Sequence, residues 1–306
     1  MLLSILANLI GIYSLLSLPL ASSFTIDVSQ LAETGNIELI EEVYRADYPY
    51  RRNNNSLGMA VSAASAIVID KESGMALWQK NPESARPVAS ITKLLTALVF
   101  LDNNPGWDEV VTIQPSDYRE GGQIRVYTGE KITIRDLFNA MLVVSSNNAA
   151  MALVRSTGLS EEEFVIAMNQ KARELGMSQS VFLEPTGLEP GNISTISDIV
   201  KLAQAAFSKD EIKWATSQKQ YTYSVLNVDR NYTLDNTNKL LNSYLDIRAG
   251  KTGYLEEAGY CLISEVKGPS EQSVIVAVLG SQSEADRFQD LKALSQWSFD
   301  NYIWEH

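Results

Sequence analysis

The chain has 306 residues, enough for one large domain or two modest ones. Its net charge of −12 argues against nucleic acid or an anionic lipid surface as a partner, because an acidic surface is repelled by both. The single histidine, His306, ends the chain, which argues against a Ser-His-Asp triad. With only one cysteine, Cys261, a His/Cys zinc site lacks ligands, and we expect no metal and no other cofactor.

The N-terminal segment differs in character from the rest of the chain. Residues 1–25 contain no charged side chain, and leucine, isoleucine and alanine dominate them. Such a stretch predicts export, either as a cleaved signal peptide or as a retained membrane anchor, and no basic residue precedes Arg45. We expect residues 26–56 to be a spacer and residues 57–306 to be the catalytic domain. That domain would lie on the extracytoplasmic face of the membrane or in the periplasm or cell-wall space, with membrane contact through the N-terminal segment only.

The predicted elements begin and end with strands. Residues 65–70 and 75–79 form one predicted hairpin, and residues 259–266 and 274–279 form another. Helical periodicity predicts helices that start at Ser90 and Thr133 and helices over 148–154, 161–175, 197–207 and 285–302. Because hairpins connect the strands, we expect an α/β (α+β) fold with an antiparallel sheet, flanking helices and a helical subdomain.

Ser90 and Lys93 form the first candidate catalytic pair. They lie three residues apart at the start of a predicted helix, so both side chains face the same side. A serine hydroxyl is a poor nucleophile until a base removes its proton. Lysine can be that base only if burial or a neighbouring cation lowers its pKa from about 10.4. Taken alone, the pair is more typical of a serine N-cap followed by a solvated lysine.

Two further short strings carry related chemistry. Residues 145–147 (Ser-Ser-Asn) lie at a polar break between helical stretches, where Ser145 offers a second hydroxyl and Asn147 an amide that can orient a substrate. Residues 251–253 (Lys-Thr-Gly) are expected just ahead of a strand. There the lysine and threonine can bind a carboxylate, and the glycine lets a substrate backbone approach. Taken alone, these strings are typical of an N-cap and of a turn.

The order Ser-x-x-Lys, Ser-x-Asn, Lys-Thr-Gly is that of penicillin-binding proteins and class A β-lactamases. With its surroundings, the set resembles the serine-type D-Ala-D-Ala carboxypeptidases, the low-molecular-weight penicillin-binding proteins, from about Ser65 to Tyr302. The matching segments are Asp70–Gly74, Arg86–Ala97, Ser145–Asn147, Asn236–Asn238, Lys251–Tyr254 and Ala258–Tyr260. The resemblance implies a DD-peptidase/β-lactamase-like fold. It also implies removal of the terminal D-alanine of peptidoglycan stem peptides through an acyl-enzyme, which β-lactam antibiotics trap covalently.

The resemblance also implies a role for each candidate residue. Ser90 would be the nucleophile, Lys93 its base and Ser145 the relay of a proton to the leaving amine. The backbone N–H groups of Ser90 and Tyr254 would form an oxyanion hole. The implied substrate-binding residues are Asn147, Lys251, Thr252, Gly253, Tyr254 and Arg287.

The chain departs from the family pattern at Asn148, Leu255 and residues 192–195. None of these residues takes part in the expected proton transfers, so the departures concern the detailed structure of the substrate. Three alternatives remain. A β-lactamase would need a deacylating glutamate, and Glu184 and Glu189 lie in a suitable region but lack the expected neighbours. A peptidoglycan DD-endopeptidase shares all three motifs. A non-catalytic penicillin-binding or sensor protein could keep the same fold.

Overall fold

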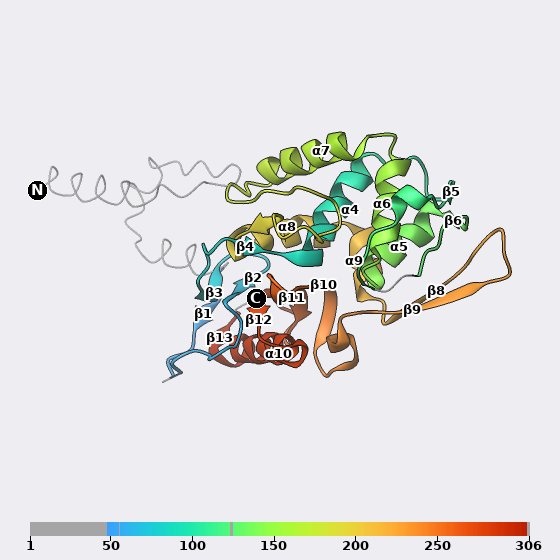
Figure 1. Ribbon diagram of the computed structural model, residues 1–306. Helices are drawn as coiled ribbons and strands as arrows, with labels where there is room; N and C mark the ends of the chain where they lie inside the picture. The colour runs from blue at the N-terminus through green and yellow to red at the C-terminus, as the bar shows by residue number, and fades with distance from the viewer. Residues whose placement is uncertain (1–47, 55, 123–124, 305–306) are drawn as a thin grey trace, which may run out of the picture. The chain divides into compact units, whose positions relative to one another are not determined.

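The computed structural model of the protein describes residues 48–54, 56–122 and 125–304 (Figure 1). The predicted signal or anchor, residues 1–25, and most of the predicted spacer lie outside these ranges. No helix within the described ranges is both long and apolar enough to cross a bilayer. Strand β1 (Tyr50–Arg51), which falls in the predicted spacer, pairs with β13 (Tyr302–Ile303) near the end of the chain.

A five-stranded antiparallel sheet is the centre of the fold, in the order β10-β11-β12-β2-β3. The predicted hairpins are confirmed as β2–β3 and β11–β12. The pairing of β12 with β2 joins them, so segments from both ends of the domain share one sheet. The strand bounds are Ser65–Asp70 (β2), Ala76–Lys80 (β3), Asp246–Leu255 (β10), Gly259–Lys267 (β11) and Ser273–Ser281 (β12).

Both faces of the sheet are covered. In β2 all six residues are buried, and successive residues face opposite sides. Ile67 and Ile69 belong to a core shared with the helical region, whereas Ala66 and Val68 belong to a second core under helix α10 (Glu284–Asn301). Figure 1 shows α10 on one face of the sheet and α8 (Ile196–Phe207) on the other.

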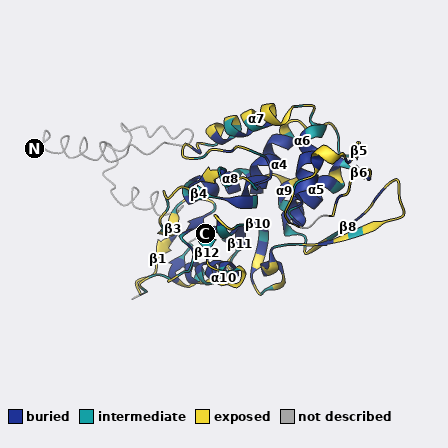
Figure 2. Ribbon diagram, in the orientation of Figure 1, coloured by how far each residue is buried: buried dark blue, intermediate teal, exposed yellow. Residues whose placement is uncertain are grey.

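The helical region is built around α4 (Thr92–Asp102), whose first nine residues are all buried. It packs against α6, α7 and α8, and Figure 2 shows exposed residues gathered on the outer side of α7. The remaining helices are α5 (Ile134–Val143), α6 (Asn147–Ser156), α7 (Glu161–Glu174) and α9 (Asp210–Ser217). The predicted fold class, an α/β arrangement of an antiparallel sheet with flanking helices and a helical subdomain, is confirmed.

Side-chain caps explain why the helix starts could be predicted. Thr133, Ser146, Ser160, Thr195 and Ser283 each accept a hydrogen bond from a backbone N–H in the first turn of the following helix. Such a bond satisfies one of the N–H groups that lack a partner within the helix.

Several elements were not predicted, and one motif was misplaced. The unpredicted elements include α9 and the hairpins β5–β6 (Val110–Thr112, Lys131–Thr133) and β8–β9 (Gln220–Ser224, Asn231–Asp235). Residues 251–253 do not precede a strand, as we expected, but lie inside β10. The cause is that Lys251 and Thr252 are polar yet buried, which removes the apolar pattern by which a buried strand is predicted.

Candidate active site

A cleft of about 490 Å³ lies between the helical region and strand β10. Its lining includes seven of the nine predicted site residues: Ser90, Ser145, Asn147, Thr252, Gly253, Tyr254 and Arg287. The other two, Lys93 and Lys251, are fully buried next to it and lie within hydrogen-bond distance of Ser90 and Ser145. The structure thus brings together all nine residues around one site.

Ser90 lies in a short 3-10 turn, η1 (Ala89–Ile91), immediately before α4. The preceding Ala89 has φ of +48°, a conformation that non-glycine residues adopt at a cost and that is common at functional sites. The Lys93 Nζ lies 2.9 Å from Ser90 Oγ and donates to Asn147 Oδ1 at 2.6 Å and to the Thr186 carbonyl oxygen. Those two acceptors use both N–H groups of a neutral amine and leave its lone pair for the Ser90 hydroxyl.

The environment of Lys93 favours the neutral amine. Burial lowers its pKa to about 7, because the charged form is poorly solvated, and the Glu184 carboxylate opposes this shift in part. At pH 7 only ~0.03 % of a lysine with an ordinary pKa is neutral, whereas about half of Lys93 is. The structure therefore supplies the condition that a lysine base requires.

Ser145 and Lys251 form a second hydroxyl–amine pair. Ser145 has φ of +61° between the end of α5 and the start of α6, where Ser146 caps α6. The Lys251 Nζ donates to Ser145 Oγ at 2.8 Å and to the Thr252 carbonyl oxygen at 3.0 Å. Burial lowers the pKa of Lys251 well below its usual value, and the charges of Lys93 and Arg287 lower it further.

Asn147 connects the lysine to the loop above the cleft. Its Oδ1 accepts from Lys93, and its Nδ2 donates to the Gly121 carbonyl oxygen at 3.0 Å. The neighbouring Asn148 is buried and instead bonds the Arg119 N–H and the Val126 carbonyl oxygen. The departure at Asn148 thus lies in loop packing, whereas Asn147 lies in the cleft.

Arg287 lies at the other end of the cleft and is mostly buried. Its Nη1 donates to the Gly253 carbonyl oxygen at 3.0 Å, and its guanidinium lies over the Tyr260 ring. Thr252 Oγ1 and Thr237 Oγ1 share a 2.6 Å hydrogen bond nearby. A guanidinium and hydroxyl groups in one place form a setting that suits a carboxylate.

Sequence reasoning missed the loop that supports Lys93. The Glu184 carboxylate accepts from the backbone N–H groups of Thr186, Gly187 and Leu188, so the turn points the Thr186 carbonyl at Lys93. Gly187 has φ of +81°, and a Cβ there would lie 2.0 Å from the Ala89 carbonyl oxygen. The Glu-Pro-Thr-Gly string at 184–187 is a turn signal that could have identified this loop.

Two charged residues at the cleft were also missed. Lys239 and Glu284 line it and form an ion pair at 2.8 Å, and Glu284 lies 3.4 Å from Arg287. We expected Gly253 to let a substrate backbone approach. The structure shows that the protein's own backbone approaches it instead, because a Cβ at this position would lie 3.1 Å from the Ser90 backbone nitrogen. The described part of the chain contains no cluster of three or more His, Cys, Asp or Glu side chains placed to hold a metal.

Comparison with known proteins identifies the family of the chain. The family model of D-alanyl-D-alanine carboxypeptidases, peptidase family S11, matches residues 51–283. A D-alanyl-D-alanine endopeptidase of Pseudomonas aeruginosa is 36% identical over 247 residues, covering 79% of this chain and 78% of the relative. The D-alanyl-D-alanine carboxypeptidase DacF of Bacillus subtilis is 32% identical over 251 residues, covering 80% of this chain and 64% of the relative.

A solved structure supports the same assignment. The crystal structure of the Streptomyces K15 DD-transpeptidase matches with a TM-score of 0.76 and 28% identity, covering 80% of this chain and all of that one. The family match spans well over half of the chain, and the solved structure shares its fold. The chain therefore belongs to the D-alanyl-D-alanine carboxypeptidase family of serine hydrolases, peptidase family S11.

Proposed function

We propose that this protein removes the terminal D-alanine from peptidoglycan stem peptides that end in D-Ala-D-Ala, through an acyl-enzyme on Ser90. The observation that carries the proposal is the buried Lys93 Nζ, 2.9 Å from Ser90 Oγ, with its pKa lowered to about 7. No histidine other than the terminal His306 is present in the sequence to act as the base.

Acylation begins when neutral Lys93 takes the proton of Ser90 Oγ, which attacks the carbonyl carbon of the penultimate D-alanine. Negative charge then develops on the carbonyl oxygen. The N–H groups of Ser90 and Tyr254 are proposed to bind it. In support, Gly253 packs closely against the Ser90 nitrogen, which places the following residue, Tyr254, beside the same point.

Departure of the D-alanine requires a proton on its nitrogen. Ser145 is suited to deliver this proton, because Lys251 donates to its oxygen at 2.8 Å and leaves the hydroxyl hydrogen to point into the cleft. Asn147 is proposed to bind the substrate backbone. Thr252, Arg287 and the buried Lys251 are proposed to bind the terminal carboxylate; in support, Thr252 and Arg287 line the cleft. The proton held by Lys93 then restores the Ser145 hydroxyl, which completes the relay. In the second step water attacks the ester carbonyl, Lys93 takes its proton, and Lys93 passes that proton to Ser90 Oγ as the ester bond breaks and the shortened peptide leaves.

The substrate defines where the protein works. Peptidoglycan lies outside the cytoplasm, so we propose an exported protein in which residues 1–25 are either a cleaved signal peptide or a retained anchor. If retained, they would be its only membrane contact. β-Lactam antibiotics, which mimic the D-Ala-D-Ala end, would acylate Ser90 and remain bound. No cofactor takes part in this scheme.

A DD-endopeptidase is the second candidate, because the Pseudomonas aeruginosa relative carries that name at 36% identity. The same groups would cleave a D-alanyl bond to the amine of a neighbouring stem peptide. A β-lactamase is less well supported: the Glu184 carboxylate is occupied by the N–H groups of its own loop and is not free to activate water.

Titration with a fluorescent penicillin tests whether the protein is an active enzyme. We expect stoichiometric label on the native protein and none on Ser90→Ala, while Ser270→Ala, an exposed serine in the β11–β12 turn, labels normally. Unlabelled native protein, or label retained in Ser90→Ala, would refute the acyl-enzyme. Mass spectrometry of the products from a pentapeptide and from a cross-linked peptide dimer then distinguishes carboxypeptidase from endopeptidase.

A further inference from the structure

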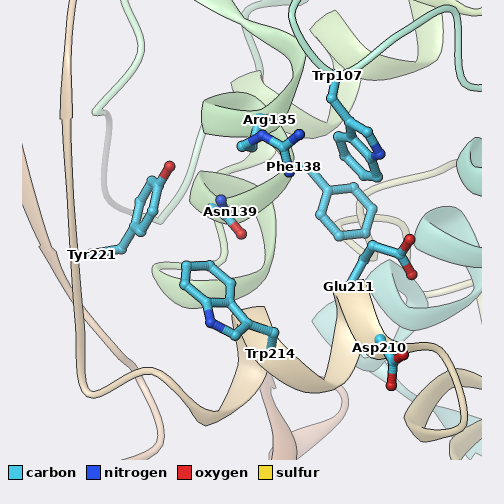
Figure 3. A pocket seen from close by; sticks show the side chains of 8 residues that line it. All are labelled: Trp107, Arg135, Phe138, Asn139, Asp210, Glu211, Trp214 and Tyr221. Carbon is cyan, nitrogen blue, oxygen red and sulfur yellow. The ribbon is translucent and has the colours of Figure 1, made fainter.

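A second cavity, of about 430 Å³, shares no lining residue with the active-site cleft. It lies between helices α5 and α9, the start of β8 and the loop that precedes β5 (Figure 3). A volume of this size is typical of pockets that bind small molecules. The proposed mechanism uses none of its side chains, so the cavity needs a separate explanation.

Aromatic rings make up much of the cavity wall. The Trp107 and Phe138 rings meet edge to face at 5.2 Å, and the Trp214 and Tyr221 rings do so at 6.0 Å. Trp214 is 50% exposed at the rim, although a tryptophan ring is among the costliest side chains to leave in water. Figure 3 shows the two pairs on different sides of the space. Ring faces arranged in this way fit a ligand with apolar faces of its own.

Polar groups of both signs line the same space. Arg135, Asp210 and Glu211 are exposed and form no ion pair with any described residue, and the Arg135 guanidinium lies over Trp107 at 5.1 Å. Asn139 is only 4% exposed and lies beside the Tyr221 hydroxyl. Amide, carboxylate and guanidinium groups of this kind can each form a hydrogen bond with a ligand hydroxyl or amide.

These groups together select a class of ligand. Two carboxylates and one guanidinium line the space, so a simple anion is disfavoured and a simple cation would leave Arg135 without an acceptor. Hydroxyl and acetamido groups both donate and accept hydrogen bonds, so they can pair with carboxylate, amide and guanidinium alike. A pyranose ring also presents an apolar C–H face to an aromatic ring. We propose that this cavity binds a saccharide that carries hydroxyl and acetamido groups.

Helix α5 connects this cavity to the active site. Asn139 lies on α5, and Ser145 follows just beyond its end, at a helical rise of about 9 Å. The further step, that the bound sugar is a glycan strand of peptidoglycan, rests on the proposed function. Binding of the sugar itself does not, so the two can fail separately.

The test is calorimetric titration of the full chain with a tetramer of β-1,4-linked N-acetylglucosamine. We expect saturable binding that Trp214→Ala weakens by at least about tenfold, because the exposed ring supplies a stacking face. Tyr244→Ala, which removes a still more exposed aromatic ring outside the cavity, should bind like the native protein. Labelling of Ser90 by fluorescent penicillin should be unchanged in both variants, which shows that they are folded and tests the proposed function independently.

Two results would overturn the saccharide assignment. One is the absence of saturable binding, or equal binding by the native protein and Trp214→Ala. The other is binding of a simple primary amine in its place, abolished in the double variant Asp210→Asn, Glu211→Gln. The saccharide assignment instead predicts that this double variant weakens tetramer binding by less than about fivefold, because amides still bond hydroxyl groups.

Discussion

The acylation rate of Ser90 by a penicillin should follow the protonation of Lys93. With a pKa of about 7, about half of this lysine is neutral at pH 7 and roughly 1 % at pH 5. The second-order rate constant should therefore fall about 50-fold between pH 7 and pH 5 and level off above about pH 8. A lysine with an ordinary pKa would instead give a rate that rises tenfold per pH unit up to about pH 10.

Stopped-flow fluorescence with a labelled penicillin measures this rate constant directly. Intrinsic fluorescence at each pH verifies that the protein remains folded over the range. Lys219→Ala, which removes an exposed lysine, should reproduce the native profile, whereas Lys93→Ala should lose acylation by at least about a thousandfold. A rate still climbing at pH 9, or near-native acylation by Lys93→Ala, would show that this amine is not the base.

Three further predictions follow from packing and charge. Gly187→Ala should lower the free energy of unfolding by at least about 3 kcal/mol and slow acylation, because its Cβ would meet a carbonyl oxygen of η1. Gly158 has the same φ of +81° but open space around it, so Gly158→Ala should lower the free energy of unfolding by only about 1 to 2 kcal/mol. Urea unfolding measures both values. Arg287→Ala should raise the KM for D-Ala-D-Ala peptides about tenfold in steady-state kinetics. The control Arg248→Ala, which removes a half-buried arginine of β10 that does not line the cleft, should leave the KM unchanged. Equal KM values for Arg287→Ala and the native protein would make Arg287 a structural residue. The pKa of Lys93 is lower in the folded protein than in the unfolded chain, so the unfolded state binds more protons between about pH 7 and 10. The free energy of unfolding should therefore rise with pH over this range. From pH 7 to 9 the rise should be about 2 kcal/mol larger in the native protein than in Lys93→Met. Equal rises in both proteins would contradict the lowered pKa.

The elements that the sequence could predict are those with local signals. Apolar and β-branched runs bounded by turn residues predicted the β2–β3 and β11–β12 hairpins, and Thr133 marked a helix start. The elements that were missed have weaker local signals. Strands β8 and β9 are short and largely exposed, and their pairing depends on contacts with the helical region.

The sequence by itself determined the chemical inventory of this protein: two candidate hydroxyls, two candidate amines, no internal histidine and a family pattern in three short strings. Only the tertiary structure decided which amine faces which hydroxyl, because Lys93 and Lys251 come from α4 and β10, elements far apart in the chain. The same holds for the loop at Glu184, which directs a carbonyl at Lys93, and for the depth at which both amines are buried. A pKa depends on desolvation and on charges within a few ångströms, and both are properties of packing between segments that no local pattern records.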